Sequence, residues 1–258
     1  MSVLLMTATI NSGYFGNIST KIKDTEERKK QYENALTNYI LHSKFDKIVF
    51  ADNSNEHLNE SYFCDLADKY GKALEFLEFP GNCDRMRAQG KSYGEAALIL
   101  EAMKGSKLIS GEPSVYKVTG RIWIENINKL INDRTETCFV AHNFKSWVLT
   151  SFFKINIEEF WETLSSAHEL CNDNTEDFEW CIEHAYYVLL KNSILPIHSI
   201  IPYPDMRGIN SGSGGFYTKT KKQLFIRNAL TLLGFYRFNP NRQFYYPLLS
   251  LLERLKHR

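Results

Sequence analysis

The sequence has few cysteines and no pair of them at a spacing typical of metal binding or redox chemistry. Its five cysteines are scattered, and the pattern CxxC does not occur. An odd number without close spacing argues against a disulfide framework and against a zinc site, and favours reduced cytosolic thiols. The five are Cys64, Cys83, Cys138, Cys171 and Cys181.

An excess of charge of one sign is also missing. The formal net charge is +1, which argues against a dedicated nucleic-acid-binding protein. No segment approaches the roughly 18 apolar residues that a membrane-spanning helix needs. The apolar run at residues 3–6 is too short for a signal peptide. We therefore expect a cytoplasmic protein, and contact with the inner face of the cytoplasmic membrane stays open.

Three catalytic motifs do not occur. The seven histidines never take HxH or HxxxH spacing, so metal ligation by histidine is not expected. The glycine-rich run at 210–215 does not match G-x-S-x-G, the motif of a nucleophile elbow. G-x-x-x-x-G-K-[ST], the phosphate loop of many nucleotide-binding proteins, is absent as well. The sequence therefore does not indicate a histidine metal site, a nucleophile elbow or a P-loop.

Apolar runs and helical periodicity alternate from the start of the chain. Residues 2–9 read as a buried strand, 25–42 as a helix with Thr25 as its cap, and 46–51 as a second strand. A strand, a helix and a strand in this order form a βαβ unit with a parallel sheet. We therefore predict an α/β fold, a Rossmann-type, mostly parallel sheet flanked by helices.

The later segments continue this alternation. Without an internal repeat or a linker, the chain is predicted to form one α/β domain at 1–215 and a helical, basic C-terminal extension at 216–258 that packs on it. The predicted helices are 58–70, 96–104, 123–130, 158–170 and 174–191. The predicted strands are 73–79, 115–121, 137–141, a strand pair within 144–154, and an edge strand at 194–201.

The predicted strand at 115–121 carries the strongest functional signal. Lys117, Thr119 and Arg121 alternate with apolar residues, so we expect their side chains on one side of the strand. In an α/β protein the carboxyl ends of the strands face the ligand crevice. Two cations and a hydroxyl there suit a phosphorylated substrate.

Two other segments are candidates for nucleotide binding. Residues 90–95, Gly-Lys-Ser-Tyr-Gly-Glu, precede a helix, where free amides attract anions and Lys91 can add a charged contact to phosphate. Residues 52–55, Asp-Asn-Ser-Asn, end the second strand and could bind a base or a ribose. The alternatives are an ordinary helix start with Glu95 in its first turn, and an ordinary turn.

Acidic residues gather at the predicted start of the helix at 174–191. Glu176 or Asp177 could act as a general base towards a hydroxyl group if it lies in a cleft. The alternative is that these carboxylates only cap the helix and offset its dipole.

The ordered set of segments resembles a known family. A strand ending at Thr9 to Asn11 is followed by a helix with Arg28 and Tyr32, and then by the motifs at 52–54, 90–95 and 117–121. This set resembles small bacterial glycosyltransferases of the GT-A type that act in capsule, O-antigen and related surface polysaccharide synthesis. The resemblance spans about residues 3–215.

The resemblance implies a nucleotide-sugar donor, with uridine as the base, and a glycan or lipid-linked acceptor. The residues around the nucleoside would be Thr9, Asn11, Arg28, Asp52 and Asn53. Those near the diphosphate and the donor sugar would be Lys91, Glu95, Lys117, Thr119, Gly120 and Arg121.

One departure from the family changes the expected chemistry. Most GT-A enzymes carry an Asp-x-Asp motif that binds a divalent ion where this chain has residues 117–121. Lys117 and Arg121 can offset the charge of the leaving diphosphate directly. We therefore predict transfer without a metal cofactor, by single displacement with inversion and with Asp177 or Glu176 as the base. A retaining enzyme would need no such base.

Two other classes of protein stay open. One is a sugar-phosphate nucleotidyltransferase, although residues 11–16 match its glycine-rich signature poorly. The other is a glycan- or nucleotide-binding module without activity, whose sugar platforms would be four exposed aromatic residues, Trp147, Phe152, Phe153 and Trp161. The basic and aromatic residues after Lys219 could touch a membrane, cap the fold or join copies of the chain.

Overall fold

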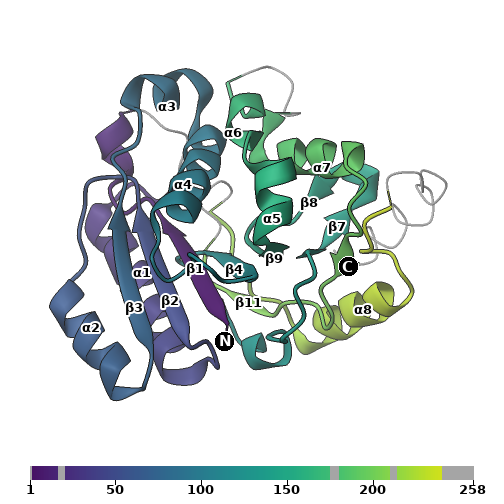
Figure 1. Ribbon diagram of the computed structural model, residues 1–258, viewed down its shortest axis with the longest axis horizontal. Helices are drawn as coiled ribbons and strands as arrows, with labels where there is room; N and C mark the ends of the chain where they lie inside the picture. Colours follow the sequence, from purple (N-terminus) through teal and green to yellow (C-terminus); the bar gives the residue numbers. More distant parts are fainter. Residues whose placement is uncertain (1, 17–20, 175–179, 210–213, 240–258) are drawn as a thin grey trace.

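A seven-stranded sheet forms the centre of the molecule in the computed structural model, which describes residues 2–16, 21–174, 180–209 and 214–239 (Figure 1). Its strand order is β10-β6-β9-β4-β1-β2-β3. All neighbouring strands pair in parallel except β9, which is antiparallel to β4 and β6. The prediction of an α/β fold with a mostly parallel sheet flanked by helices is confirmed. The strands are β1 Val3–Ala8, β2 Lys47–Asp52, β3 Ala73–Glu78, β4 Ser114–Thr119, β6 Cys138–Phe139, β9 Phe152–Asn156 and β10 His198–Ser199.

The two faces of the sheet are buried in separate apolar clusters, because side chains alternate along each strand. Val3 and Leu5 of β1 pack with helix α4 (Lys91–Gly105) and helix α7 (Ile182–Asn192). The intervening Leu4 and Met6 pack with helix α1 (Thr25–His42) and helix α2 (Glu60–Lys69). Every residue of β1 is buried. Burial on both faces explains why β1 reads as a continuous apolar run in the sequence.

The order of the strands places a crevice between β1 and β4. From β1 the chain builds outward to β2 and β3 on one side, and then returns to add β4 on the other side. At such a reversal the connections after the two central strands leave in opposite directions, which opens a crevice beyond their carboxyl ends. Thr9 directly follows β1, and Gly120 and Arg121 directly follow β4.

Three local predictions were wrong. Residues 123–130 are not a helix, since Trp123–Ile124 form strand β5, which pairs with strand β11 (Met206–Arg207), and only a short 3-10 turn follows. Strand β4 ends at Thr119, two residues earlier than predicted. The cap of α1 is Asp24, whose carboxylate accepts a hydrogen bond of 2.7 Å from the backbone N–H of Glu27.

The remaining elements complete the second half of the molecule. No described helix is long and apolar enough to cross a bilayer. The predicted helix at 158–170 occurs as short helical pieces, and the predicted strand pair within 144–154 contributes to β8 and β9. The expectation that Phe152 and Phe153 are exposed is wrong, because both are fully buried in β9 of the central sheet. These elements are helix α3 (Cys83–Gln89), strands β7 (Ala141–His142) and β8 (Trp147–Val148), helices α5 (Ile157–Glu159) and α6 (Ala167–Leu170), a π-helical turn at Phe160–Leu164, and helix α8 (Lys221–Leu232).

Candidate functional site

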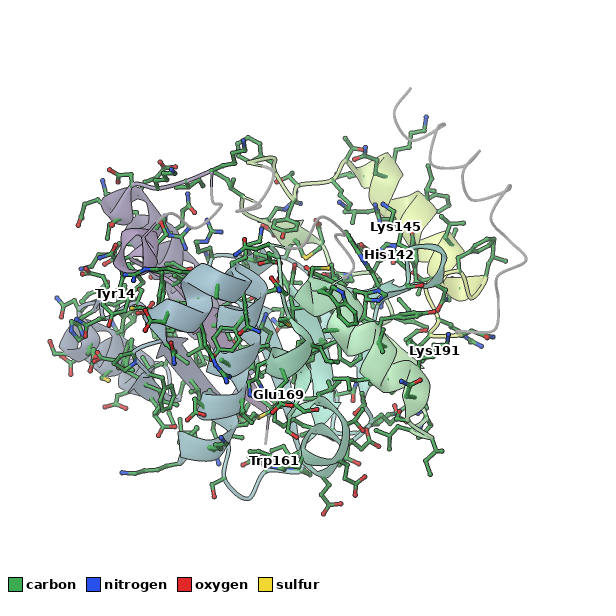
Figure 2. The ribbon with its side chains drawn as sticks, turned by 90° about the horizontal axis from the view of Figure 1, so that it is seen from above. Tyr14, His142, Lys145, Trp161, Glu169 and Lys191 are labelled. Carbon is green, nitrogen blue, oxygen red and sulfur yellow. The ribbon has the colours of Figure 1, made fainter. Side chains whose placement is uncertain are left out.

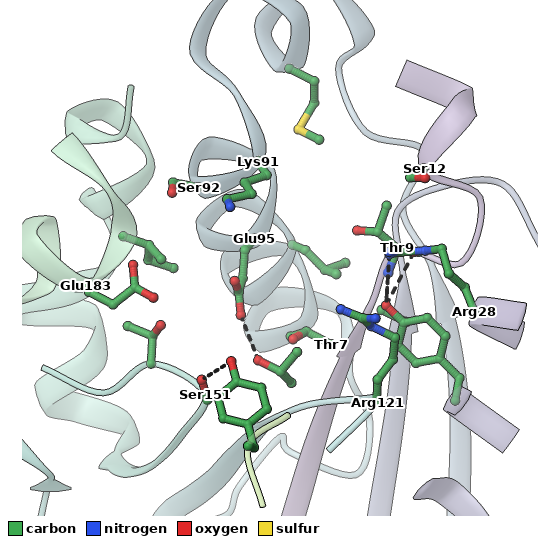
Figure 3. Close-up of a pocket in the computed structure, with 18 residues that line it drawn as sticks. Thr7, Thr9, Ser12, Arg28, Lys91, Ser92, Glu95, Arg121, Ser151 and Glu183 are labelled. Carbon is green, nitrogen blue, oxygen red and sulfur yellow. Dashed lines mark hydrogen bonds between the residues drawn. The ribbon is translucent and has the colours of Figure 1, made fainter. Parts of the chain in front are cut away.

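A pocket of about 160 Å³ opens at the carboxyl ends of β1 and β4, where the strand order predicts a ligand crevice (Figure 3). Six predicted site residues line it, and each comes from a segment singled out in the sequence. They are Thr9, Arg28, Lys91, Glu95, Thr119 and Arg121. The other lining residues include Ser12, Tyr32, Ser92, Thr150, Ser151, Glu183 and Tyr217.

The loop after β1 is held in place by Arg28 and Tyr32 of helix α1. The Arg28 Nε donates hydrogen bonds of 3.0 Å to the carbonyl oxygens of Thr9 and Ile10. The Tyr32 hydroxyl accepts a 3.0 Å hydrogen bond from the backbone N–H of Thr9. Burial lowers the pKa of the Arg28 guanidinium. Arg28 therefore uses several of its N–H donors to fix the conformation of the loop that forms this wall of the pocket.

Three predicted nucleoside-binding residues do not line this pocket, namely Asp52, Asn53 and Asn11. Their side chains form hydrogen bonds that stabilise the loops around it. The Asp52 carboxylate accepts hydrogen bonds from the backbone N–H groups of Ile10 at 2.9 Å and Ser54 at 2.6 Å. Burial raises the pKa of Asp52, and these hydrogen bonds offset part of the rise. The side chain of Asn11 accepts from the N–H of Tyr14.

Asn53 joins the loop after β1 to helix α4. It accepts a 2.7 Å hydrogen bond from the hydroxyl of Thr9 and donates to the carbonyl of Gly94 at 3.3 Å. It also borders a second cavity of about 210 Å³, on the side of α4 that faces β3 and α3. Together with Asp52 and Asn11, it occupies a supporting position, whereas the resemblance implies direct contact with a nucleoside.

The start of α4 is already occupied by a carboxylate. Asp173 accepts hydrogen bonds from the backbone N–H of Ser92 at 2.8 Å and from its hydroxyl at 2.5 Å. Gly90 has a φ of +89°, and a Cβ there would lie 2.7 Å from the Cβ of Asp173. The prediction that free amides bind phosphate here is therefore wrong for Ser92. Lys91 is exposed and still lines the pocket.

Lys117 lies below the floor of the pocket and not in its wall. Its side chain is fully buried, and its ammonium forms an ion pair with Glu95 of α4. The same ammonium donates to the carbonyl of Thr150 at 2.8 Å and to the hydroxyl of Thr119 at 3.3 Å. With three acceptors already met, Lys117 is placed to orient Glu95 and not to contact a phosphate directly.

Gly120 brings the turn after β4 close against β1. Its N–H donates a 2.8 Å hydrogen bond to the carbonyl of Thr7, and a Cβ there would lie 2.9 Å from that oxygen. No larger residue fits this approach without moving one of the strands. The turn carries Arg121 away from the α4 face of the strand, where Lys117 lies, and towards α1.

Arg121 is a buried cation without a carboxylate partner. Its side chain is 5% exposed, and within the described parts of the chain no carboxylate lies within 4.0 Å of it. One nitrogen donates to the Gln31 amide oxygen at 2.9 Å, and the guanidinium lies 5.8 Å from the centre of the Tyr32 ring. Its Nε is buried and has no hydrogen-bond partner. A buried charge in this state is costly unless an anion binds beside it.

Glu183, in the first turn of α7, faces Arg121 across the pocket and was missed by the sequence reasoning (Figure 3). Burial raises the pKa of its carboxyl, and the negative charge of Glu95 raises it further. Hydrogen bonds from the side chains of Cys181 and Thr150 lower the pKa in part. The sequence signal was an acidic residue in the first turn of a helix, but that helix was predicted to start at residue 174. The predicted bases Glu176 and Asp177 lie outside the described residues.

Tyr217 and Ser151 close the side of the pocket next to β4. Their hydroxyl groups lie 3.3 Å apart at hydrogen-bonding distance (Figure 3). Burial raises the pKa of Tyr217. Nothing in the local sequence marks either residue, because they meet only through the tertiary fold.

Comparison with known proteins gives structural similarities but no sequence match. No protein-family model matches the chain, and no curated protein sequence matches it. The glycosyltransferase GlyE of Streptococcus pneumoniae is 12% identical with a TM-score of 0.47, over 77% of this chain and 45% of GlyE. A protein of Desulfovibrio desulfuricans described as a nucleotide-diphospho-sugar transferase is 13% identical with a TM-score of 0.47, over 100% of this chain and 98% of that one.

A third similar structure belongs to another class of enzyme. The nucleoside-diphosphate-sugar pyrophosphorylase of Vibrio cholerae is 13% identical with a TM-score of 0.44, over 76% of this chain and 90% of that one. The present chain spans less than half of the length of GlyE. At these identities and TM-scores the similarities assign no family, so the function must be inferred from the site itself.

Proposed function

We propose that this protein is a glycosyltransferase that moves a sugar from a nucleotide-diphosphate sugar to a hydroxyl group of an acceptor. The observation that supports this most is the guanidinium of Arg121, a residue that lines the pocket, is largely buried and has no carboxylate partner among the described residues. An anion with several oxygens, such as a diphosphate, would supply the missing acceptor and offset the buried charge. Lys91 at the rim would add a second positive charge.

Positive and negative side chains lie on opposite walls of the pocket. Arg121 and Arg28 lie on the α1 side, Glu183 lies on the α7 side, and Glu95 and Lys91 lie between them (Figure 3). This separation suits a reaction in which a phosphate leaves at one wall and a proton is taken up at the other. In the proposed reaction the diphosphate binds next to Arg121, and the acceptor hydroxyl approaches from the side of Glu183.

Glu183 is the described carboxylate best placed to act as the base. Glu95 is held by the ammonium of Lys117, whereas no cation of the described residues forms an ion pair with Glu183, and burial raises the pKa of Glu183. Two carboxylates in such different surroundings take different roles. The Glu183 carboxylate accepts the hydroxyl proton as the acceptor oxygen bonds to the anomeric carbon. The bond from that carbon to the diphosphate breaks, and the nucleoside diphosphate leaves with the electron pair, with inversion.

The finer identity of the substrates rests on the resemblance of the sequence motifs. These motifs support a uridine nucleotide as the donor and a glycan or lipid-linked acceptor in bacterial surface polysaccharide synthesis. The carboxylate at the acceptor wall favours a hydroxyl acceptor over the phosphate acceptor of a nucleotidyltransferase, since a phosphate monoester is already largely ionised near neutral pH.

Binding of the donor should raise the melting temperature of the protein. At a concentration 100 times the Kd, a ligand that binds only the folded state adds about 2.7 kcal/mol, or a shift of roughly 5 °C for a chain of this size. The measurement is a thermal-shift screen with nucleosides, nucleoside diphosphates and nucleotide-sugars. Nucleosides without phosphates serve as the control. Equal shifts with nucleosides and diphosphates, or none with either, would contradict the proposal.

Chelation of divalent metal should leave turnover unchanged. Arg121 and Lys91 already place two positive charges at the pocket, which can offset the leaving diphosphate. The one group of described residues able to hold a metal ion, His57, Glu60 and Glu78, is exposed and outside the pocket. Release of nucleoside diphosphate from the donor should be the same in EDTA and in Mg²⁺ within about twofold. Complete loss in EDTA that Mg²⁺ restores would show that the charge argument is wrong.

A further inference from the structure

Helix α8 has an apolar outer surface in addition to the face that packs on the core. Its inner face carries Leu230 and Thr231, which are buried, and Arg227, which donates a 3.0 Å hydrogen bond to the hydroxyl of Tyr203. These contacts attach the inner face of α8 to the domain. A helix docked in this way normally presents polar residues to solvent. Here the outward positions need a separate explanation.

The outward side combines large apolar side chains with lysines. Phe225 is 74% exposed, and Leu232 and Leu233 are 70% and 69% exposed. Lys221 and Lys222 are exposed in the first turn of the same helix. Phe216, five positions before the first residue of the helix, is 76% exposed. We call these six residues the α8 outer face.

The sequence around this face lacks acidic residues. Residues 206–252 contain seven Lys or Arg and no Asp or Glu. Residues 206–258 hold ten Lys or Arg and one Glu, whereas residues 1–205 hold 21 basic and 29 acidic residues. The near-neutral net charge of the chain therefore hides two parts of opposite sign. A strongly basic surface with exposed apolar groups is typical of contact with an anionic, partly apolar partner.

From these observations we infer that the α8 outer face docks on an anionic lipid surface. Phe225 and the two leucines would enter the boundary between headgroups and acyl chains, while Lys221 and Lys222 stay with the phosphates. A nucleic acid would satisfy the lysines but would gain little from the aliphatic side chains. The combination of both residue types on one helix therefore favours lipid.

Occupants from the chain itself fit less well because of charge. A two-fold dimer through this face would bring the lysines of both copies into one interface, and the outer face has no acidic residue to offset them, which is unfavourable. The segment 240–258 is basic as well, with four Lys or Arg and a single Glu. Covering the outer face with it would again bring like charges together.

The outer face and the pocket are joined at adjacent residues. Tyr217 lines the pocket, and the neighbouring Phe216 belongs to the outer face. Helix α8 lies at the rim of the molecule, on the opposite side of it from α2 (Figure 1). In the view from above, Lys145 and His142 lie next to α8, and the His142 ring packs 5.2 Å from that of Tyr236 (Figure 2). One exposed apolar residue of the outer face is thus next in the chain to a residue that lines the pocket.

The test is flotation of the full chain with vesicles. Vesicles of phosphatidylcholine with phosphatidylglycerol should bind the protein at least tenfold more tightly than vesicles of phosphatidylcholine alone, and less tightly in high salt. Lys221→Ser with Lys222→Ser should weaken binding about fivefold for each lysine. Phe225→Asn with Leu232→Asn should weaken it about tenfold.

Matched variants on the acidic part of the chain serve as controls. Lys30→Ser with Lys69→Ser removes two exposed lysines, and Tyr62→Asn removes an exposed aromatic ring. These changes should leave vesicle binding unaltered, and the melting temperatures of all variants should match the wild type.

The inference is overturned by any of four results. They are equal binding to neutral vesicles, binding to neither kind, α8 variants that bind as the wild type does, or a concentration-dependent dimer that only the α8 variants abolish. The proposed transferase activity is measured separately on a soluble donor, so the two proposals can fail independently.

Discussion

Replacing Arg121 with alanine is expected to lower the release of nucleoside diphosphate from a nucleotide-sugar by about 10³-fold. Arg121 is 5% exposed, its Nε has no hydrogen-bond partner, and the residue lines the pocket where the diphosphate is proposed to bind. Its loss removes the positive charge that would stabilise the leaving group. The measurement is kcat/KM for the nucleotide-sugar that gives the largest thermal shift, with that shift also recorded for the variant.

A structural role for Arg121 would give a different pattern. A buried guanidinium without a carboxylate costs stability, so the unliganded Arg121→Ala protein should unfold within about 1 kcal/mol of the wild type or be more stable. Arg121→Lys keeps the charge but cannot form two parallel hydrogen bonds, and should recover only part of the activity. Arg134→Ala, at a side chain that is 73% exposed, is the matched control. A large loss of stability with normal turnover per folded molecule would contradict the proposal.

The sequence was sufficient to predict the architecture because the spacing of apolar residues along the chain reflects which side chains are buried in each element. Strands covered on both faces, such as β1, appear as unbroken apolar runs, and helices between them follow the 3.6-residue period. The same reasoning failed at 123–130. There the conformation is decided by pairing of Trp123 with Arg207, 84 positions later. Local periodicity carries no information about such a partner.

The candidate site was predictable only where a residue follows a strand end. Thr9 and Arg121 line the pocket because the strand order brings the ends of β1 and β4 together. The sequence could not show that Lys117 would form an ion pair with Glu95. It also could not show that Asp173 would accept a hydrogen bond from the backbone N–H of Ser92 at the start of α4. Both contacts join distant segments. Glu183 was missed for the same reason, since its environment depends on Glu95 in another helix.

Replacing Glu183 with glutamine is expected to reduce turnover by about 10²- to 10⁴-fold while leaving the thermal shift caused by the donor unchanged. Glutamine has nearly the same shape but cannot accept the acceptor proton. Because the pKa of Glu183 is raised, wild-type turnover should rise with pH above the ordinary range of a glutamate, as the carboxyl loses its proton. The variant should lack this rise. The measurement is kcat as a function of pH for both proteins.

The same pKa shift predicts an opposite trend in stability. A carboxyl with a higher pKa in the folded protein than in the unfolded chain binds its proton more tightly when folded. Its contribution to the free energy of unfolding is therefore full below the unfolded pKa and is lost as pH rises through the folded pKa. Glu183→Gln should have a melting temperature close to that of the wild type in acid and a higher one at pH 8.

Glu169→Gln is the matched control, because Glu169 is an exposed carboxylate that does not line the pocket. It should change neither the pH profile nor the melting temperature. A Glu183→Gln enzyme with wild-type turnover would move the role of base to Glu176 or Asp177, whose amide variants would then lose the activity instead. A joint fall in donor binding and turnover would instead show that Glu183 shapes the donor site. The role of Glu183 as the base therefore requires two results for Glu183→Gln. The variant must lose turnover while it still binds the donor, and it must be more stable than the wild type above neutral pH.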